Sequence, residues 1–307
     1  MVVSKVRGHA AAPADAIVPA GAAGRTARCR GAALPCAMAY REAAAPGAPP
    51  GLVECAWSAG AAAGGVGVVH QVLPDGCMDL VWTGTELVVA GPDTAPHPAR
   101  RAPGIRTSGL RFAPGRLPAL LGVPAVELRD RRVPLAELHP RLGRLAVDRL
   151  SGAAGRVQPA GPVDAAPDTA PDTVLHTALH TALDTPTIRL LVGVTRALPG
   201  GPPDRAVPVL AARLGAAAPG GAGVAVAELA DALGWTPRTL HRRCLAAFGY
   251  GPAVLRRVLR FRRATDLLRA GMRPAEVAAR AGYADQPHLS RELRALGGIS
   301  PARLATR

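Results

Sequence analysis

The chain of 307 residues has little of several things that soluble proteins usually contain. Only 3% of its residues are aromatic, and Lys5 is the single lysine among 37 basic residues. Its five cysteines are an odd number at irregular spacings, without a Cys-x-x-Cys pair. This pattern argues against a disulfide framework and against a zinc site, and it favours a reduced, cytoplasmic location.

Long apolar runs are also missing from the sequence. No uncharged apolar stretch reaches the roughly 18 residues that a membrane span needs, and the N-terminus lacks a basic-then-apolar secretion signal. We therefore expect a soluble protein with no membrane partner. Glycine and proline are abundant, at 35 and 31 residues, so part of the chain is expected to be loop or disordered.

Positive charge dominates what is present, with a net charge of +15. The excess is densest near the C-terminus, because residues 221–307 hold 15 arginines and only 6 acidic residues. An anionic partner such as nucleic acid is the first explanation of such a balance. The length of the chain favours two domains over one.

Composition divides the chain into four parts. Residues 1–38 lack a sustained apolar period and are expected to be a disordered leader. Residues 39–150 contain short apolar runs separated by turn signals such as Pro74-Asp75-Gly76, which predict a mostly β domain with helices at its end. Residues 151–203 form a low-complexity linker with short helices, and residues 204–307 have helical periodicity.

Two short helices are predicted beside this linker, over residues 187–198 and 204–214, each opened by a capping residue. We expect them to pack on the C-terminal domain or on a second subunit.

The C-terminal region contains one pattern twice, and its first copy begins with a predicted helix over residues 226–233 that ends at Gly234. Thr236 is the expected N-cap of the next helix, whose inward stripe begins at Leu240. The outward side of this second helix carries candidate DNA-binding residues, namely Arg238, Thr239, His241 and Arg242.

In the second copy, a helix over residues 274–281 ends at Gly282, and Asp285 is the expected cap of the helix that follows. Leu289 begins its inward stripe. Its exposed side carries side chains that can contact base edges and phosphates, namely Gln286, His288, Ser290, Arg291 and Arg294.

An arginine-rich helix over residues 252–270 is predicted to join the two copies. At 1.5 Å per residue its length is roughly 28 Å, close to the ~34 Å between successive major-groove openings on one face of B-DNA. One chain could thus place two helices in adjacent grooves.

These segments resemble the signature of AraC/XylS transcription regulators over residues 205–307. The motifs that carry the resemblance lie at 226–234, 240–243, 260–264, 281–286, 289–291 and 298–301. The resemblance implies a seven-helix domain with two helix-turn-helix motifs, and it places Arg238, His241, Arg242, Gln286 and Arg291 at base-facing positions. The sequence departs from the pattern at Cys244 and Leu293, where the family often has Phe, and at Arg273, where it has Ser or Thr.

Residues 40–138 are similar to sensor domains that precede such DNA-binding domains, through segments 73–80, 90–92, 111–115 and 127–130. This similarity implies a degenerate, cupin-like barrel. A metal-binding cupin needs a clustered His-x-His and a nearby Glu, whereas His70 and His97 stand alone. Neither a metal nor another cofactor is therefore expected.

The predicted fold class is α+β, with a mostly β, cupin-like N-terminal domain followed by an all-α domain with two helix-turn-helix motifs. The predicted function is a transcription factor bound to double-stranded DNA and controlled by a small-molecule effector or by dimerisation. A homodimer, and RNA polymerase if the protein is an activator, are the further partners that this function implies.

No catalytic residue is expected. Asp75 and Asp79 could form an acid–base pair, but a Pro-Asp-Gly turn explains Asp75 by conformation alone. Two alternatives remain: an enzyme whose catalytic N-terminal domain is fused to a regulatory DNA-binding module, and a nucleoid-type protein that binds DNA without sequence preference.

Overall fold

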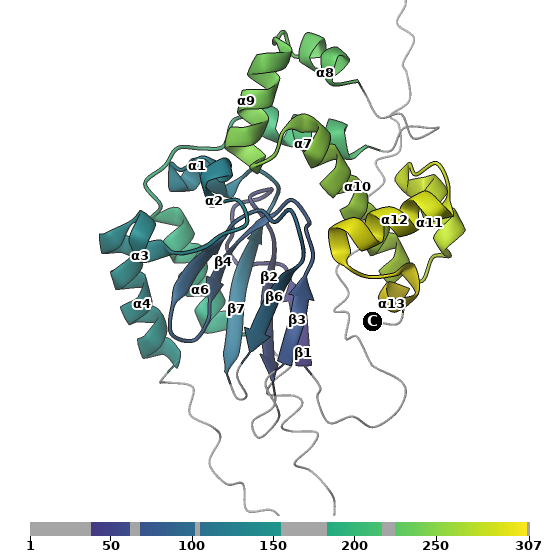
Figure 1. Ribbon diagram of the computed structural model, residues 1–307. Helices are drawn as coiled ribbons and strands as arrows, with labels where there is room; N and C mark the ends of the chain where they lie inside the picture. Colours follow the sequence, from purple (N-terminus) through teal and green to yellow (C-terminus); the bar gives the residue numbers. More distant parts are fainter. Residues whose placement is uncertain (1–37, 62–67, 102–104, 155–182, 217–224, 306–307) are drawn as a thin grey trace, which may run out of the picture.

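The computed structural model describes residues 38–61, 68–101, 105–154, 183–216 and 225–305. In them a domain built on β-strands, the β-domain (residues 38–198), precedes an all-helical domain, the helical domain (residues 204–305) (Figure 1). This is the predicted α+β class with the predicted order. The predicted disordered leader falls almost entirely outside the described residues, and the first strand begins at Met38.

The β-domain contains a six-stranded antiparallel sheet in the order β1-β2-β7-β4-β5-β8 and a separate ribbon in which β3 pairs with β6. Its strands are β1 (Met38–Ala43), β2 (Val53–Ala61), β3 (Val68–Val72), β4 (Met78–Trp82), β5 (Leu87–Ala90), β6 (His97–Arg101), β7 (Arg106–Phe112) and β8 (Arg132–Pro134).

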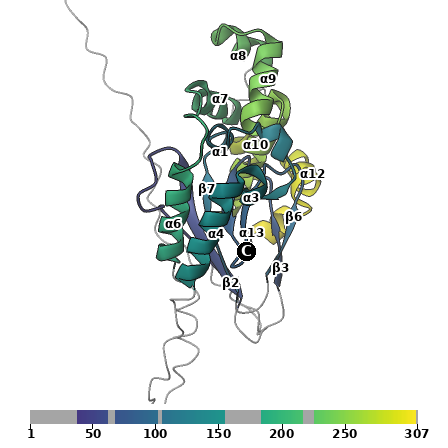
Figure 2. The same cartoon turned by 90° about the vertical axis from the view of Figure 1, so that its left-hand side faces the viewer.

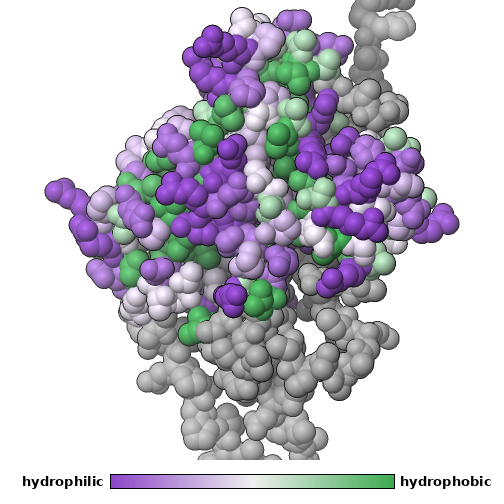
Figure 3. Space-filling model, in the orientation of Figure 1, coloured by the Kyte–Doolittle hydropathy of each residue, from purple (hydrophilic) through white to green (hydrophobic). Residues whose placement is uncertain are grey.

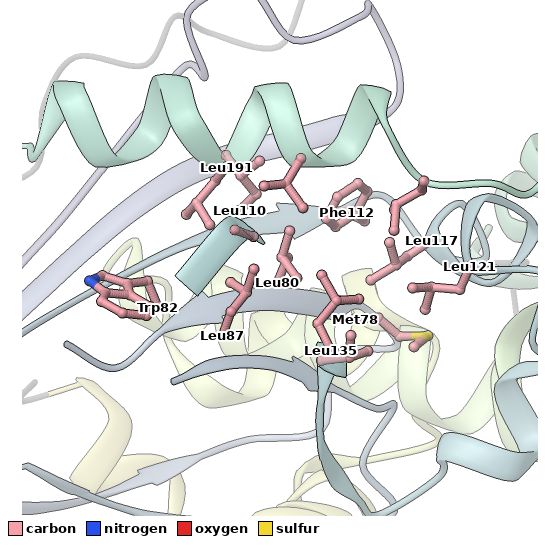
Figure 4. Packing of buried hydrophobic residues seen from close by; sticks show 14 of the residues in the cluster. Met78, Leu80, Trp82, Leu87, Leu110, Phe112, Leu117, Leu121, Leu135 and Leu191 are labelled. Atoms are coloured by element: carbon pink, nitrogen blue, oxygen red, sulfur yellow. The ribbon is translucent and has the colours of Figure 1, made fainter. Parts of the chain in front are cut away.

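The core of the β-domain lies on one face of the six-stranded sheet. Alternation along β4 buries Met78, Leu80 and Trp82 on this face, and Leu110 joins them from the neighbouring strand (Figure 4). The helices of this domain are α1 (Leu117–Leu121), α2 (Ala125–Leu128), α3 (Leu135–Leu138), α4 (Pro140–Ala154) and α6 (Thr185–Arg196).

Helix α6 corrects our expectation for the helix predicted at 187–198. Instead of packing on the helical domain or on a second subunit, it lies beside α4 on the sheet, where Ile188 and Leu191 are fully buried in the core (Figures 2 and 4). Asp184 caps the helix and its backbone N donates to Ser58 Oγ at 3.2 Å. An amphipathic stripe predicts that a helix is covered, but not by which surface.

The Pro74-Asp75-Gly76 turn is present, with a φ of +78° at Gly76. It does not close a hairpin, because it leads from β3 in the ribbon to β4 in the larger sheet. The turn therefore lies where the two sheets meet.

The helical domain is organised around its longest helix, α10, with one small core near each end. Its helices are α7 (Ala206–Gly215), α8 (Val226–Ala232), α9 (Pro237–Phe248), α10 (Pro252–Arg269), α11 (Pro274–Ala281), α12 (Gln286–Gly297) and α13 (Pro301–Ala305). Helix α7 packs on α10, as expected for the prediction at 204–214. No helix among the described residues is long and apolar enough to cross a bilayer.

Candidate DNA interface

The first helix-turn-helix unit consists of α8, a tight turn and α9. Gly234 has a φ of +65°, a left-handed conformation that glycine adopts without strain. Thr236 then caps α9, because its Oγ1 accepts a hydrogen bond from the backbone N of Thr239 at 3.2 Å. Leu240 and Cys244 are fully buried and anchor the inner side of α9. The predicted turn, cap and inward stripe are confirmed.

The second unit repeats this construction with α11 and α12. Gly282 has a φ of +77°, and Asp285 caps α12 by accepting a hydrogen bond from the backbone N of His288 at 2.6 Å. Leu289 and Leu293 are fully buried on the inner side. Both units therefore present the outer side of their second helix away from a small apolar core.

Helix α10 joins the two units and spans 18 residues, a length of about 27 Å. Its Leu255 and Val258 belong to the core of the first unit, whereas Phe261 and Leu268 belong to the core of the second. The two units lie toward opposite ends of this helix in both views (Figures 1 and 2).

A paired set of charges fixes α12 on α10. Arg257 donates to both carboxylate oxygens of Glu292, with distances of 2.7 and 3.0 Å, and the guanidinium of Arg260 lies 4.6 Å from the ring centroid of Tyr283. Burial acts to raise the pKa of Glu292, but the hydrogen bonds and charge of Arg257 outweigh it, and the pKa is lowered. Glu292 is thus ionised and bound within the domain.

The predicted DNA-binding residues fall into two groups by exposure. Six are exposed: Arg238, His241, Arg242, Gln286, Arg291 and Arg294. Three are half-buried: Thr239, His288 and Ser290. The surface over α11 and α12 is largely hydrophilic (right of Figure 3).

Two of the half-buried residues take part in the fold of their own unit. The hydroxyl of Thr239 accepts a hydrogen bond from Thr236 Oγ1 at 3.0 Å. His288 Nδ1 accepts one from the backbone N of Ala284 at 3.4 Å, and its ring meets Tyr283 edge-on. Periodicity places both residues on the outward side of a helix, but it does not reveal these local partners.

Other arginines of the helical domain stand outside the predicted set. Arg263 on α10 and Arg273 before α11 are exposed, and their position off the apolar stripe is the signal that could have identified them. Arg243 has partners, since it lies 4.3 Å from the Trp235 ring and pairs with Asp204 at 2.5 Å.

The β-domain holds a second cluster of charges, on the sheet face opposite its core. Arg111 lies within 3.5 Å of oxygens of Glu42, Asp75 and Asp79, and Trp57 Nε1 donates to Asp79 at 2.9 Å. Burial raises the pKa of Asp79 to about 6. Asp75 Oδ1 also accepts from the backbone N of Cys77 at 2.8 Å, which supports the conformational explanation of this residue.

His70 and His97 lie on the paired strands β3 and β6, in different register positions. In the parts of the chain that the structure describes, no three His, Cys, Asp or Glu side chains gather as a metal site. The expectation of no metal remains a prediction.

Two family models match separate parts of the chain. A model described as a helix-turn-helix domain matches residues 229–307, and a domain of unknown function (DUF6597) matches residues 50–134. No curated protein has a significant match to the chain.

Among solved structures, the C-terminal domain of AraT, a response regulator from Geobacillus stearothermophilus, is 23% identical, covering 34% of this chain and 87% of its own with a TM-score of 0.31. The apo form of a single-residue variant of ToxT from Vibrio cholerae strain SCE256 is 9% identical, with coverages of 90% and 98% and a TM-score of 0.40. Wild-type ToxT from the same strain, bound to unsaturated fatty acid, is 9% identical; the match covers 78% of this chain and 94% of that chain, with a TM-score of 0.38.

The matched C-terminal region and its two capped helix pairs place this chain among helix-turn-helix DNA-binding proteins. Two capped helix pairs on one connecting helix are the arrangement that the resemblance to AraC/XylS regulators implies, and the matched domain supports a DNA-binding transcription regulator.

Proposed function

We propose that this regulator contacts two major-groove segments of one DNA duplex, with α9 in one and α12 in the other. The observation that carries this proposal is the repeated construction: each helix is capped at its N-terminus, anchored by buried apolar side chains and exposed on its outer side. The length of α10, about 27 Å, suits a separation close to one helical turn of B-DNA.

The exposed side chains supply the chemistry of base recognition. Arginine pairs with the O6 and N7 of guanine and glutamine with adenine, so Arg238, Arg242, Arg291 and Gln286 are the residues that we assign to base edges or phosphates. His241 and Arg294 extend the same two surfaces. Thr239, His288 and Ser290 contribute through their exposed edges.

The β-domain is the proposed controlling part, through a small-molecule effector or through a homodimer. Its direct packing on the helical domain supports this role, because a change in the β-domain can then act on α9 and α10. RNA polymerase is a further partner if the protein activates transcription.

Selection of bound fragments from genomic DNA tests the proposal. A two-part motif with parts about one helical turn apart is expected, whereas a nucleoid-type protein would enrich no motif. Arg242→Ala and Arg291→Ala should each weaken binding to the selected duplex by about 1 to 3 kcal/mol and relax one part of the motif only.

Arg189→Ala is the matched control, since Arg189 is an exposed arginine on α6 of the β-domain. It removes the same charge and should leave both affinity and motif unchanged. Equal losses in all three variants would show that net charge, and not α9 and α12, governs binding.

A further inference from the structure

The Pro74–Cys77 turn of the β-domain lies directly on the connecting helix α10. A Cβ added at Gly76 would lie 3.4 Å from Leu259 Cδ2 and 3.7 Å from Val258 Cγ1. With Leu255 and Arg262, these two residues form a stripe at i, i+3, i+4 and i+7 on one side of α10. The turn therefore covers one continuous side of the helix that carries both helix-turn-helix units.

A polar contact adjoins this apolar one. Arg262 donates to both carboxylate oxygens of Glu54 on β2, at 3.0 and 2.5 Å, and its Nη1 lies 3.2 Å from Cys77 Sγ. Cys77 is buried, and burial raises the pKa of its thiol well above the usual value. The thiol thus lies inside the contact between the two domains.

The contact reaches both helix-turn-helix units. Near the first, Tyr250 Oη donates to the backbone O of Asp93 at 2.5 Å, and Arg129 donates to the backbone O of Gly249 at 3.2 Å. Near the second, Leu73 packs against the core that α11 and α12 share. The β-domain accordingly touches both units as well as the helix between them.

Asp75 connects this contact to the buried charge cluster of the β-domain. Its Oδ1 holds the turn through the backbone N of Cys77, and its Oδ2 lies 3.4 Å from Arg111 Nε. Arg111 also forms ion pairs with Asp79 and Glu42. Asp75 forms its hydrogen bond and ion pair within the β-domain, and its charge also acts on Arg262 of α10.

We propose that Asp75 is a positioning residue that couples the Arg111 cluster to the docking of the β-domain on α10. In the docked form the turn covers α10, and the Glu54–Arg262 pair is the polar part of the contact. The proposal rests on the proposed function, because it names how the β-domain would control the two DNA-contacting helices. An effector that takes one of the partners of Arg111 would shift the balance between docked and undocked forms.

Alkylation of Cys77 measures docking without any DNA when the thiol pKa of each variant is obtained from the pH dependence of its rate, because the charges of Asp75 and Glu54 also raise that pKa directly. Full-length protein is treated with iodoacetamide, and labelling is followed peptide by peptide, with Cys244 in the helical core as the internal reference. Glu54→Gln and Asp75→Asn should each raise the Cys77 rate relative to Cys244 by about fivefold, the factor that corresponds to about 1 kcal/mol in the docking equilibrium. Tyr250→Phe, which removes the hydrogen bond to the backbone O of Asp93 and leaves the charges of Asp75 and Glu54 in place, should raise the Cys77 rate too if docking is one cooperative contact.

Glu276→Gln is the matched control, since it removes one negative charge from an exposed pair on α11 and should leave the ratio unchanged. A wild-type ratio in Asp75→Asn, with a raised ratio in Glu54→Gln, would overturn the coupling through Asp75. A wild-type ratio in Tyr250→Phe would overturn cooperative docking.

The selected duplex provides the second measurement. Saturating DNA should change the Cys77 rate of the wild-type protein and change it less in Asp75→Asn, because coupling between two sites is reciprocal. A protein that shows the Asp75 effect but binds no DNA would contradict the proposed function while leaving the docking inference intact. An equal DNA effect in both proteins would overturn the coupling.

Discussion

The two domains use arginine in opposite ways. In the β-domain, the side chain of Arg111 is 21% exposed and is surrounded by three carboxylates. In the helical domain, Arg238, Arg242 and Arg291 are exposed on the outer sides of two capped helices. A buried guanidinium with several acidic partners stabilises one arrangement of its own domain, whereas an exposed one is available to a phosphate or a base.

Arg257 lies between these extremes. Its side chain is 42% exposed and it binds both oxygens of Glu292. This pair is structural, yet it belongs to the domain whose other arginines are exposed. Whether an arginine is bound within the fold or left exposed therefore depends on whether a carboxylate lies nearby in space, and not on the domain that contains the arginine.

The largest effect is expected from Arg111→Gln. Its removal leaves Asp75 and Asp79 without their counter-charge in a mostly buried site, and losing one partner of such a site is strongly destabilising. We expect the free energy of unfolding of the β-domain to fall by about 3 kcal/mol. Urea unfolding followed by tryptophan fluorescence measures it, since Trp57 lies at the cluster; a loss below about 0.5 kcal/mol would show that the cluster is not structural.

Protonation of Asp79 should have the next largest effect. Burial raises its pKa to about 6, above the ~3.9 of an exposed aspartate. The folded protein thus binds this proton more tightly than the unfolded chain does. The contribution of protonated Asp79 to the free energy of unfolding is therefore fully present below about pH 4 and is lost as the pH rises through 6.

Between pH 4 and 7 this contribution amounts to about 2 kcal/mol. Comparison of unfolding free energies for wild type and Asp79→Asn isolates it, because other carboxylates contribute equally to both curves. The difference between the curves should change across this range, and parallel curves would show that Asp79 titrates in its ordinary range.

Glu292→Gln tests the intermediate pair and should cost the helical domain about 1 kcal/mol, reduced from the value of a buried pair because Arg257 is partly exposed. Since the pair joins α12 to α10, recognition should weaken in the part of the motif assigned to α12. Fragment selection with the variant checks this expectation. Equal weakening of both parts would mean that the pair stabilises the whole domain without positioning α12.

Local chemistry made the helical domain predictable from the sequence. Thr236 and Asp285 cap their helices within three residues, and Gly234 and Gly282 mark turns by a conformation that other residues avoid. The exposed positions of α9 and α12 follow from the period of a helix once its apolar side is known.

The contacts that the sequence did not predict join residues far apart in the chain. Glu42 and Arg111 are separated by 69 positions, and Glu54 and Arg262 by 208. No local pattern distinguishes these arginines from Arg242, because pairing depends on sheet register and on domain packing. The same limit explains why α6 was assigned to the wrong surface.

The smallest effect on folding should come from Arg242→Ala and Arg291→Ala, although they remove the same side chain as a change at Arg111. Both residues are exposed, so each should change the free energy of unfolding of the helical domain by less than about 0.5 kcal/mol. Thermal unfolding without DNA measures this. A loss near that of Arg111→Gln would mean that these arginines hold the fold together, and any fall in DNA affinity would then follow from unfolding. Stability retained together with a relaxed motif would establish that Arg242 and Arg291 contact DNA and do not stabilise the domain.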